Sequence, residues 1–160
     1  MKTAEEIEFY LRNRLIHQLG AIPENTPALW GTMNVRQMIE HLAWPFKASN
    51  GSFTMPQTTP EDKLERVKAI GLLNDRPMQH NFQNPIYTDE YKQLRNANIE
   101  AALIELQNDI DLFVSSFKSQ DPSFTRMHNI FGPLNFHEWL QFHFKHCMHH
   151  LEQFGVEIDC

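Results

Sequence analysis

The sequence has little cysteine, no excess of positive charge and no long apolar run. Its 160 residues include only two cysteines, Cys147 and Cys160, too few for a fold held by disulfide bonds. The 14 Lys and Arg against 20 Asp and Glu give a net charge of −6, which offers no electrostatic reason to expect nucleic acid. No segment approaches the roughly 20 apolar residues of a membrane span, and the acidic N-terminus lacks a signal-peptide core. We therefore expect a cytoplasmic protein that binds neither nucleic acid nor membrane.

Several familiar catalytic and binding motifs are also missing. The sequence contains no glycine-rich phosphate loop, no CxxC pair and no HExxH zinc motif. It shows no internal repeats, low-complexity tracts, convincing strands or domain linkers. Its 41% apolar and 21% charged composition is that of an ordinary globular protein. We expect residues 1–160 to form a single domain.

Helical patterns account for most of what the sequence does contain. Thr3 and Glu6 form a capping box ahead of an apolar stripe that Gly20 ends. A second helix is predicted to start near Asn34, and Pro45 either kinks it or ends it early. These two helices are joined by a loop that is rich in proline.

About 40 residues separate the second helix from the longest one, and an insertion of this length often covers a site. It includes a short helix that begins at Thr59-Pro60 and ends near Gly71. The longest helix is predicted to begin at 88–90, with these residues on its buried side: Tyr91, Leu94, Ile99, Ala102, Leu106, Ile110, Phe113 and Phe117. Residues 119–134 are predicted to be loop. The fold class is all-α, a four-helix bundle with an additional short helix and long connecting loops.

The last predicted helix, residues 135–155, contains five of the nine histidines and neither proline nor internal glycine. On a wheel with about 3.6 residues per turn, His143 and His150 fall within about 60° of His146, among apolar residues. Gln153 lies about 20° from His146 on its other side. Imidazoles on a core-facing stripe require a physical reason.

Two explanations are open for these histidines. A buried histidine can hydrogen-bond to a carbonyl or carboxylate without further function. Alternatively, His146 and His150 stand at i and i+4, the spacing at which two imidazoles on one helical face can bind one metal ion. The clustering favours a metal or catalytic site, which needs a third ligand from another helix. His41, judged by its own helix, is predicted to be a satisfied, partly buried histidine, and Cys147 a small core residue.

Two stretches of the sequence together resemble a known family. MNVRQMIEHLAW, early in the chain, and KHCMHHLEQFG, in the last helix, are similar to the histidine motifs of the DinB-like superfamily of metal-binding helical bundles, including the YfiT-type proteins. The family's late motif is histidine, two residues, two histidines, two residues and glutamine. It is met here by His146, His149, His150 and Gln153, and the family's early histidine corresponds to His41.

This resemblance implies that His41, His146 and His150 bind one divalent ion, with nickel and zinc as the expected metals. Three neutral imidazoles leave coordination positions open, as in catalytic rather than structural sites. Three further residues are candidates to orient the ligands or a bound water: His143, His149 and Gln153. The resemblance also implies a homodimer that pairs through its outer helices.

The sequence leaves the reaction open between two enzyme hypotheses and one binding hypothesis. A metal-dependent hydrolase normally needs a second acid–base group, and none is predicted near the histidines. Transfer of a low-molecular-weight thiol, activated by the metal, needs less help and is the hypothesis that we favour. A non-catalytic protein that binds metal or a small molecule is the third possibility. We expect an apolar small-molecule substrate in a cavity lined by four aromatic residues: Trp44, Phe46, Phe53 and Trp139.

Overall fold

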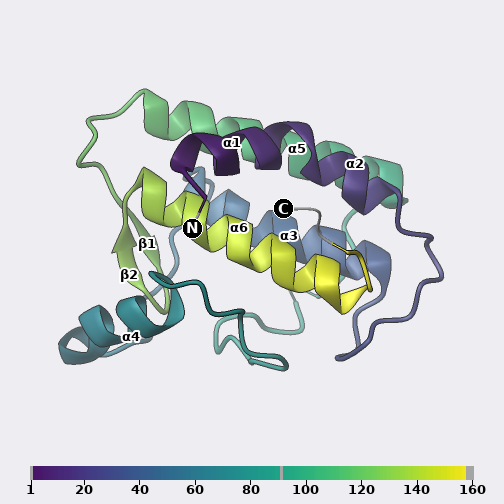
Figure 1. Cartoon of the computed structure of the whole chain (residues 1–160), viewed down its shortest axis with the longest axis horizontal. Coiled ribbons are helices and arrows are strands. Elements are labelled where there is room, and N and C mark those ends of the chain that lie inside the picture. The colour runs from purple at the N-terminus through teal and green to yellow at the C-terminus, as the bar shows by residue number, and fades with distance from the viewer. Residues whose placement is uncertain (1, 91, 158–160) are drawn as a thin grey trace.

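The computed structural model describes residues 2–90 and 92–157, and within them four helical segments form a bundle (Figure 1). The first segment consists of two short helices in line, and the other three are single long helices. Their bounds are α1 Ala4–Asn13 with α2 Leu15–Gly20, α3 Val35–Ser49, α5 Ile99–Lys118 and α6 Phe136–Gln153. The all-α fold class is therefore confirmed. No helix in the described part of the chain is long and apolar enough to cross a membrane.

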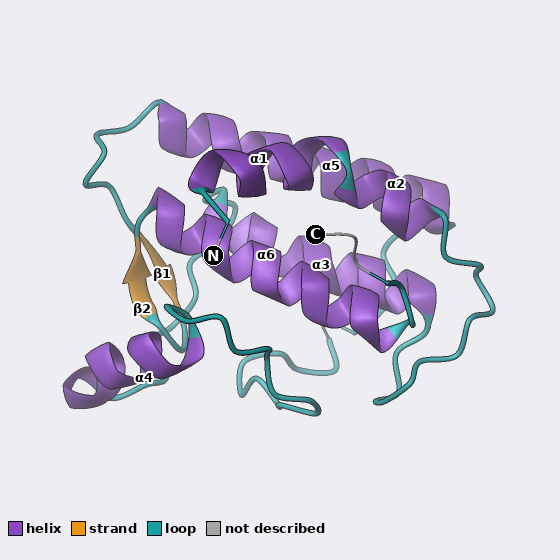
Figure 2. Ribbon diagram, viewed as in Figure 1, coloured by secondary structure: helices purple, strands orange, loops and turns teal. Residues whose placement is uncertain are grey.

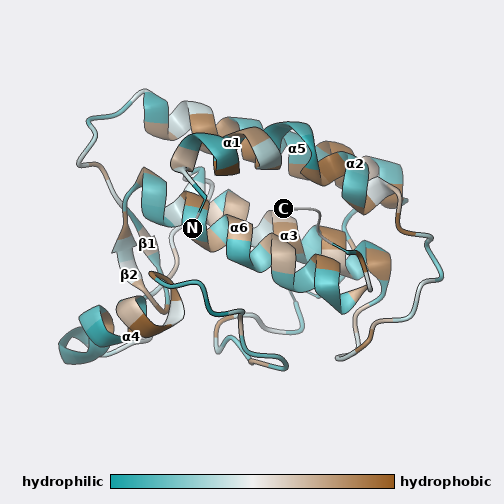
Figure 3. Ribbon diagram, viewed as in Figure 1, coloured by the Kyte–Doolittle hydropathy of each residue, from teal (hydrophilic) through white to brown (hydrophobic). Residues whose placement is uncertain are grey.

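The four helical segments pack side by side around a shared core. Both α1 and α3 contact α5 and α6, so α1 and α3 occupy opposite corners. Polar and apolar segments alternate along the helices, as amphipathic packing requires (Figure 3). Ser49 faces His143 while His41 faces His146, so α3 and α6 run antiparallel. This pairing lets two segments far apart in the sequence build one site.

Local signals explain where three of the helices begin. Thr3, Asn34 and Asn135 each form a capping box at the start of α1, α3 and α6, respectively. The first predicted helix is divided at Arg14 into α1 and α2. The α3 helix continues past Pro45 to Ser49, so proline does not end it. Since proline has no N–H group, the carbonyl of His41 lacks its usual helical donor.

The longest helix begins later than its sequence predicts. It starts at Ile99 with Asn98 as its cap, not at residues 88–90. The buried carboxylate of Glu40 accepts hydrogen bonds from the backbone N–H groups of Arg95 and Asn96, both at 2.8 Å. These bonds hold the chain against α3 in a non-helical path, so tertiary contacts override the local helical preference. Leu94, predicted to be buried, is exposed, and Tyr91 lies outside the described residues.

A short β-hairpin replaces part of the loop predicted at residues 119–134 (Figure 2). Its antiparallel strands are β1, Arg126–His128, and β2, Gly132–Leu134. The expectation that the chain has no strands is therefore wrong. His128 stabilises the turn because its Nδ1 accepts hydrogen bonds from two backbone N–H groups, those of Ile130 and Phe131. A three-residue strand is too short to produce a recognisable alternating pattern.

The long insertion between α3 and α5 lies beside the bundle (Figure 1). It contains the 3-10 helix η1, Glu61–Lys63, followed by α4, Leu64–Gly71, and these confirm the predicted short helix. Lys145 of α6 holds the end of α4 in place, since its Nζ donates to the carbonyls of Gly71 and Asn74 at 3.2 and 3.0 Å. The insertion is thus tied to the face of the bundle that carries the histidines.

Candidate metal centre

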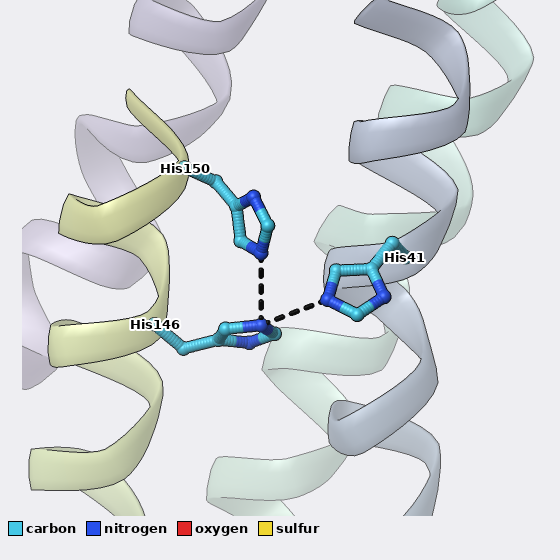
Figure 4. A group of neighbouring side chains, drawn as sticks. All are labelled: His41, His146 and His150. Carbon is cyan, nitrogen blue, oxygen red and sulfur yellow. Dashed lines mark hydrogen bonds between the residues drawn. The ribbon is translucent and has the colours of Figure 1, made fainter. Parts of the chain in front are cut away.

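Three imidazoles converge between α3 and α6 (Figure 4). His41 comes from the middle of α3, and His146 and His150 come from consecutive turns of α6. His146 Nε2 lies 2.9 Å from His41 Nε2 and 3.1 Å from His150 Nε2. One ring nitrogen from each residue falls within 4.8 Å of the other two. Helical spacing brings two of these rings together, and antiparallel packing supplies the third.

The amide of Gln153 fixes the tautomer of His150. Gln153 Nε2 donates to the backbone carbonyl of Trp30 at 2.8 Å, so the amide oxygen faces the other way. That oxygen lies 2.7 Å from His150 Nδ1, which must therefore carry the proton and donate it. His150 Nε2, which faces His146, is left with a free lone pair. The side chain is prepared to act as a metal ligand through Nε2.

Burial keeps the three imidazoles neutral. Desolvation lowers the pKa of His41 and of His146 well below the ordinary value, and the neighbouring histidines lower both further. Desolvation also lowers the pKa of His150, to about 4, although the hydrogen bond to Gln153 opposes the shift. A metal ligand must be the neutral form of imidazole, so the protein does not have to lose a proton before it binds an ion at neutral pH.

The donor set fits a divalent cation. His146 Nε2 faces two other ring nitrogens, and no more than one proton can lie in each contact. A single cation would accept the lone pairs of all three nitrogens together. Ligands of one tetrahedral zinc ion lie roughly 3.3 Å apart. Two of the observed separations are 2.9 and 3.1 Å, and all three nitrogens lie within 4.8 Å of one another, so binding of one ion requires the side chains to rotate. His41 Nδ1 is buried and has no hydrogen-bond partner among the described residues, so no second hydrogen bond orients that ring.

A cavity of about 1100 Å³ opens beside the histidines. All three of them line it, together with residues of α4, the hairpin and the irregular part of the insertion. Its apolar wall includes Met33, Trp44, Met55, Ile70, Phe82 and Phe142. The insertion therefore covers the site, as the sequence predicts. A cavity of this size can hold a small organic molecule against the imidazoles.

Only one of the four aromatic residues predicted to line the cavity does so. Trp44 is in the wall, whereas Phe46, Phe53 and Trp139 are not among the lining residues that the structure describes. Phe46 and Trp139 are almost fully buried, and both stack against His143. They therefore belong to the core. Helical periodicity identifies a buried face but does not separate core from cavity wall.

The remaining candidate histidines lie at different depths. His143 is fully buried, and its Nε2 contacts the hydroxyl of Ser49 at 2.8 Å. His149 is half-buried and packs beside Trp30 and His80, with ring centroids 5.5 and 5.6 Å away. The His149 ring also contacts that of His150, with centroids 5.0 Å apart. Of the three candidates to orient the ligands, Gln153 has a hydrogen bond to one of the converging imidazoles, that of His150.

Sequence reasoning missed two residues near the centre. His128 is assigned to a loop by its sequence, yet it is buried in the cavity wall, where desolvation lowers its pKa to about 3. Tyr87, from the insertion, packs its ring at 4.6 Å from His41, edge to face. Desolvation raises the pKa of Tyr87 to about 12, so its phenol stays protonated at neutral pH. Neither position has a distinctive local motif.

The fold and the site together define a class of protein: a helical bundle with a candidate metal site made of three converging, buried or half-buried histidines beside a cavity. The family model of the DinB superfamily matches residues 12–154, and the chain belongs to this superfamily. The resemblance drawn from the two histidine motifs is therefore confirmed. No curated protein and no solved structure matches the chain at a significant level.

Proposed function

We propose that His41, His146 and His150 bind one divalent metal ion, nickel or zinc, and that the site is catalytic. The observation that carries this proposal is the convergence of three neutral imidazole nitrogens on one point beside a cavity. Membership of the DinB superfamily supports it. Imidazole suits nickel and zinc alike, so the donor set does not choose between them.

The proposed reaction is the transfer of a low-molecular-weight thiol to an apolar electrophile. Bound at the three histidines, a divalent ion supplies Lewis acidity and lowers the pKa of a coordinated thiol. Gln153 keeps the His150 lone pair directed at the ion. The apolar wall, with Trp44 and Phe142, holds the electrophile and excludes water from it. Cys147, the only cysteine within the described residues, is fully buried, and desolvation raises the pKa of its thiol. Cys147 is therefore unsuited to supply the reacting thiol, and we assign that role to a small thiol.

The charge of the cavity wall favours thiol transfer over hydrolysis. Among the described residues that line the cavity there is no Asp or Glu. Hydrolysis of an amide normally uses a nearby acid to protonate the leaving nitrogen, and a phenol with a pKa of about 12 is a poor substitute. A thiolate that attacks an electrophile needs no such donor. Hydrolase activity is therefore the second candidate.

The test is a panel of apolar electrophiles, esters and amides, assayed with nickel- and zinc-loaded protein in the presence and absence of small thiols. We expect turnover of electrophiles that requires a thiol and that is lost in His41→Ala and His150→Ala. His137→Ala removes another histidine of α6 outside the cluster and serves as the control. Ester or amide cleavage that is equally fast without thiol would replace transfer by hydrolysis. Thermal stabilisation by ligands without any turnover would indicate a binding protein.

A further inference from the structure

The cavity has a charge that contrasts with the charge of the whole chain. The protein carries a net charge of −6, yet the described lining includes four cationic residues and no carboxylate. The four cations are Lys63, Arg66, Arg76 and Lys92. All of them belong to the insertion that covers the site, and all of them are exposed. We call these four residues the cationic rim.

Most of the rim is not neutralised by the protein. Among the described residues, no carboxylate lies within ion-pair distance of Lys63, Arg66 or Arg76. Only Lys92 has such a partner, Asp89, whose side chain is itself almost fully exposed. By contrast, Lys68 of α4 pairs with Glu138 at 3.0 Å. The cavity-facing cations of the insertion are therefore available to a ligand.

Burial separates the rim from the histidines. The cationic side chains are exposed, whereas the three histidines are buried or half-buried at the inner wall. Apolar residues such as Ile70, Phe82 and Phe142 also line the cavity. A molecule that fits this arrangement has an apolar body and a negative group that stays at the mouth.

We propose that the cavity selects an organic anion, an apolar molecule whose carboxylate is held by the cationic rim while its other end points to the histidines. This inference rests on the proposed function for its choice of the reacting end. Lys63 ends η1, Arg66 lies three residues later in the first turn of α4, and Arg76 follows in the irregular segment. A low-dielectric cavity rimmed by charge of one sign also raises the local concentration of oppositely charged ligands.

The test compares two probes of nearly equal shape, 4-phenylbutyrate and its neutral amide, by calorimetric titration. Each is measured with metal-free and with zinc-loaded protein, at low and at high salt. We expect the anion to bind roughly tenfold more tightly than the amide at low salt, as several exposed ion pairs together allow. The preference should shrink at high salt, because exposed charges are screened.

The variant Lys63→Gln/Arg66→Gln/Arg76→Gln should reduce the preference to less than about threefold. The matched control, Lys2→Gln/Arg14→Gln/Lys118→Gln, removes the same charge from residues outside the cavity lining and should keep the preference. Equal binding of the two probes to the unmodified protein would overturn the proposal. So would a preference that survives in the rim variant but disappears when the metal is removed. Absence of turnover with every electrophile would refute the proposed reaction and leave this measurement unaffected.

Discussion

Gln153 and His150 form a hydrogen bond of 2.7 Å in which the position of the proton is fixed by a third group, the carbonyl of Trp30. The Trp30 carbonyl orients the amide, and the amide oxygen then holds the proton on His150 Nδ1. The connection between α2 and α3, where Trp30 lies, thus reaches the site through one side chain of α6. Groups that orient a ligand in this way commonly contribute 10–100-fold to metal affinity.

Gln153→Leu should therefore weaken metal binding by roughly 10–100-fold, because His150 loses the acceptor that fixes its tautomer. Gln153→Glu keeps an acceptor at the same position and should retain most of the affinity. The measurement is a competition titration against a chromophoric chelator. Gln141→Leu, a substitution on the same helix, is the matched control and should bind metal normally. If the Leu and Glu variants bound metal with equal affinity, the hydrogen bond between Gln153 and His150 would not contribute to metal binding.

Protein purified without a metal-affinity tag should contain about one divalent ion per chain, as three imidazole ligands to one ion require. Elemental analysis measures the metal content. We expect no bound metal in any of three variants: His41→Ala, His146→Ala and His150→Ala. His149→Ala should preserve the metal content, because His149 contacts the His150 ring but is not one of the three histidines that converge. A protein that is metal-free and also fails to take up added nickel or zinc would refute the proposed centre.

Acid should destabilise the protein through His128. Its pKa is lowered from 6.5 to about 3 by burial, so the unfolded chain takes up the proton first. The stability that neutral His128 contributes is complete above pH 6.5 and is lost as the pH falls towards 3. Its largest contribution to the slope is about 1.4 kcal/mol per pH unit. Urea unfolding of chelator-treated protein at several pH values measures the free energy.

His128→Asn is the comparison for this slope. The amide oxygen of Asn can accept the backbone hydrogen bonds that His128 Nδ1 accepts from Ile130 and Phe131, but it does not titrate. Other buried histidines titrate in both proteins, so the difference between the two slopes is the quantity of interest. We expect a flatter slope for the variant. Parallel curves would mean that His128 takes up no proton on unfolding in this range.

We also propose that the chain is a homodimer that pairs through its outer helices. Phe9 of α1 and Ile104 of α5 expose 55% and 63% of their surface, an apolar area that pairing would cover. Sedimentation at micromolar concentration should show a dimer, which Ile104→Glu should dissociate by introducing a charge. Leu29→Glu, at an equally exposed position between α2 and α3, should leave the dimer intact. Monomer alone in the unmodified protein would refute the proposal.

Short-range signals in the sequence predict where several helices begin and which of their residues share one face. Three capping boxes mark helix starts, because a cap depends on residues that are three positions apart. The pairing of His146 with His150 follows from helical spacing alone. Gln153 could likewise be placed near His150, since both lie on the same face of α6.

Only the tertiary structure decides which residues from distant segments meet at the site. His41 is 105 residues from His146 in the chain, and only the antiparallel packing of α3 on α6 brings their nitrogens to 2.9 Å. Without the family resemblance, His41 has no local feature that distinguishes it from other partly buried histidines. The late start of α5 has a similar cause, because it depends on the remote carboxylate of Glu40.

The cavity wall is also a tertiary property. Trp44 and Phe46 belong to the same apolar helix, yet Trp44 lines the cavity and Phe46 packs in the core. Periodicity reports only that a side chain avoids water, and both environments meet that condition. The cationic rim is equally invisible in the sequence, since Lys63 and Arg76 are ordinary exposed residues until the insertion folds over the histidines. Local propensities act over one or two helical turns, whereas a site assembled from several distant segments depends on the packing of the whole chain.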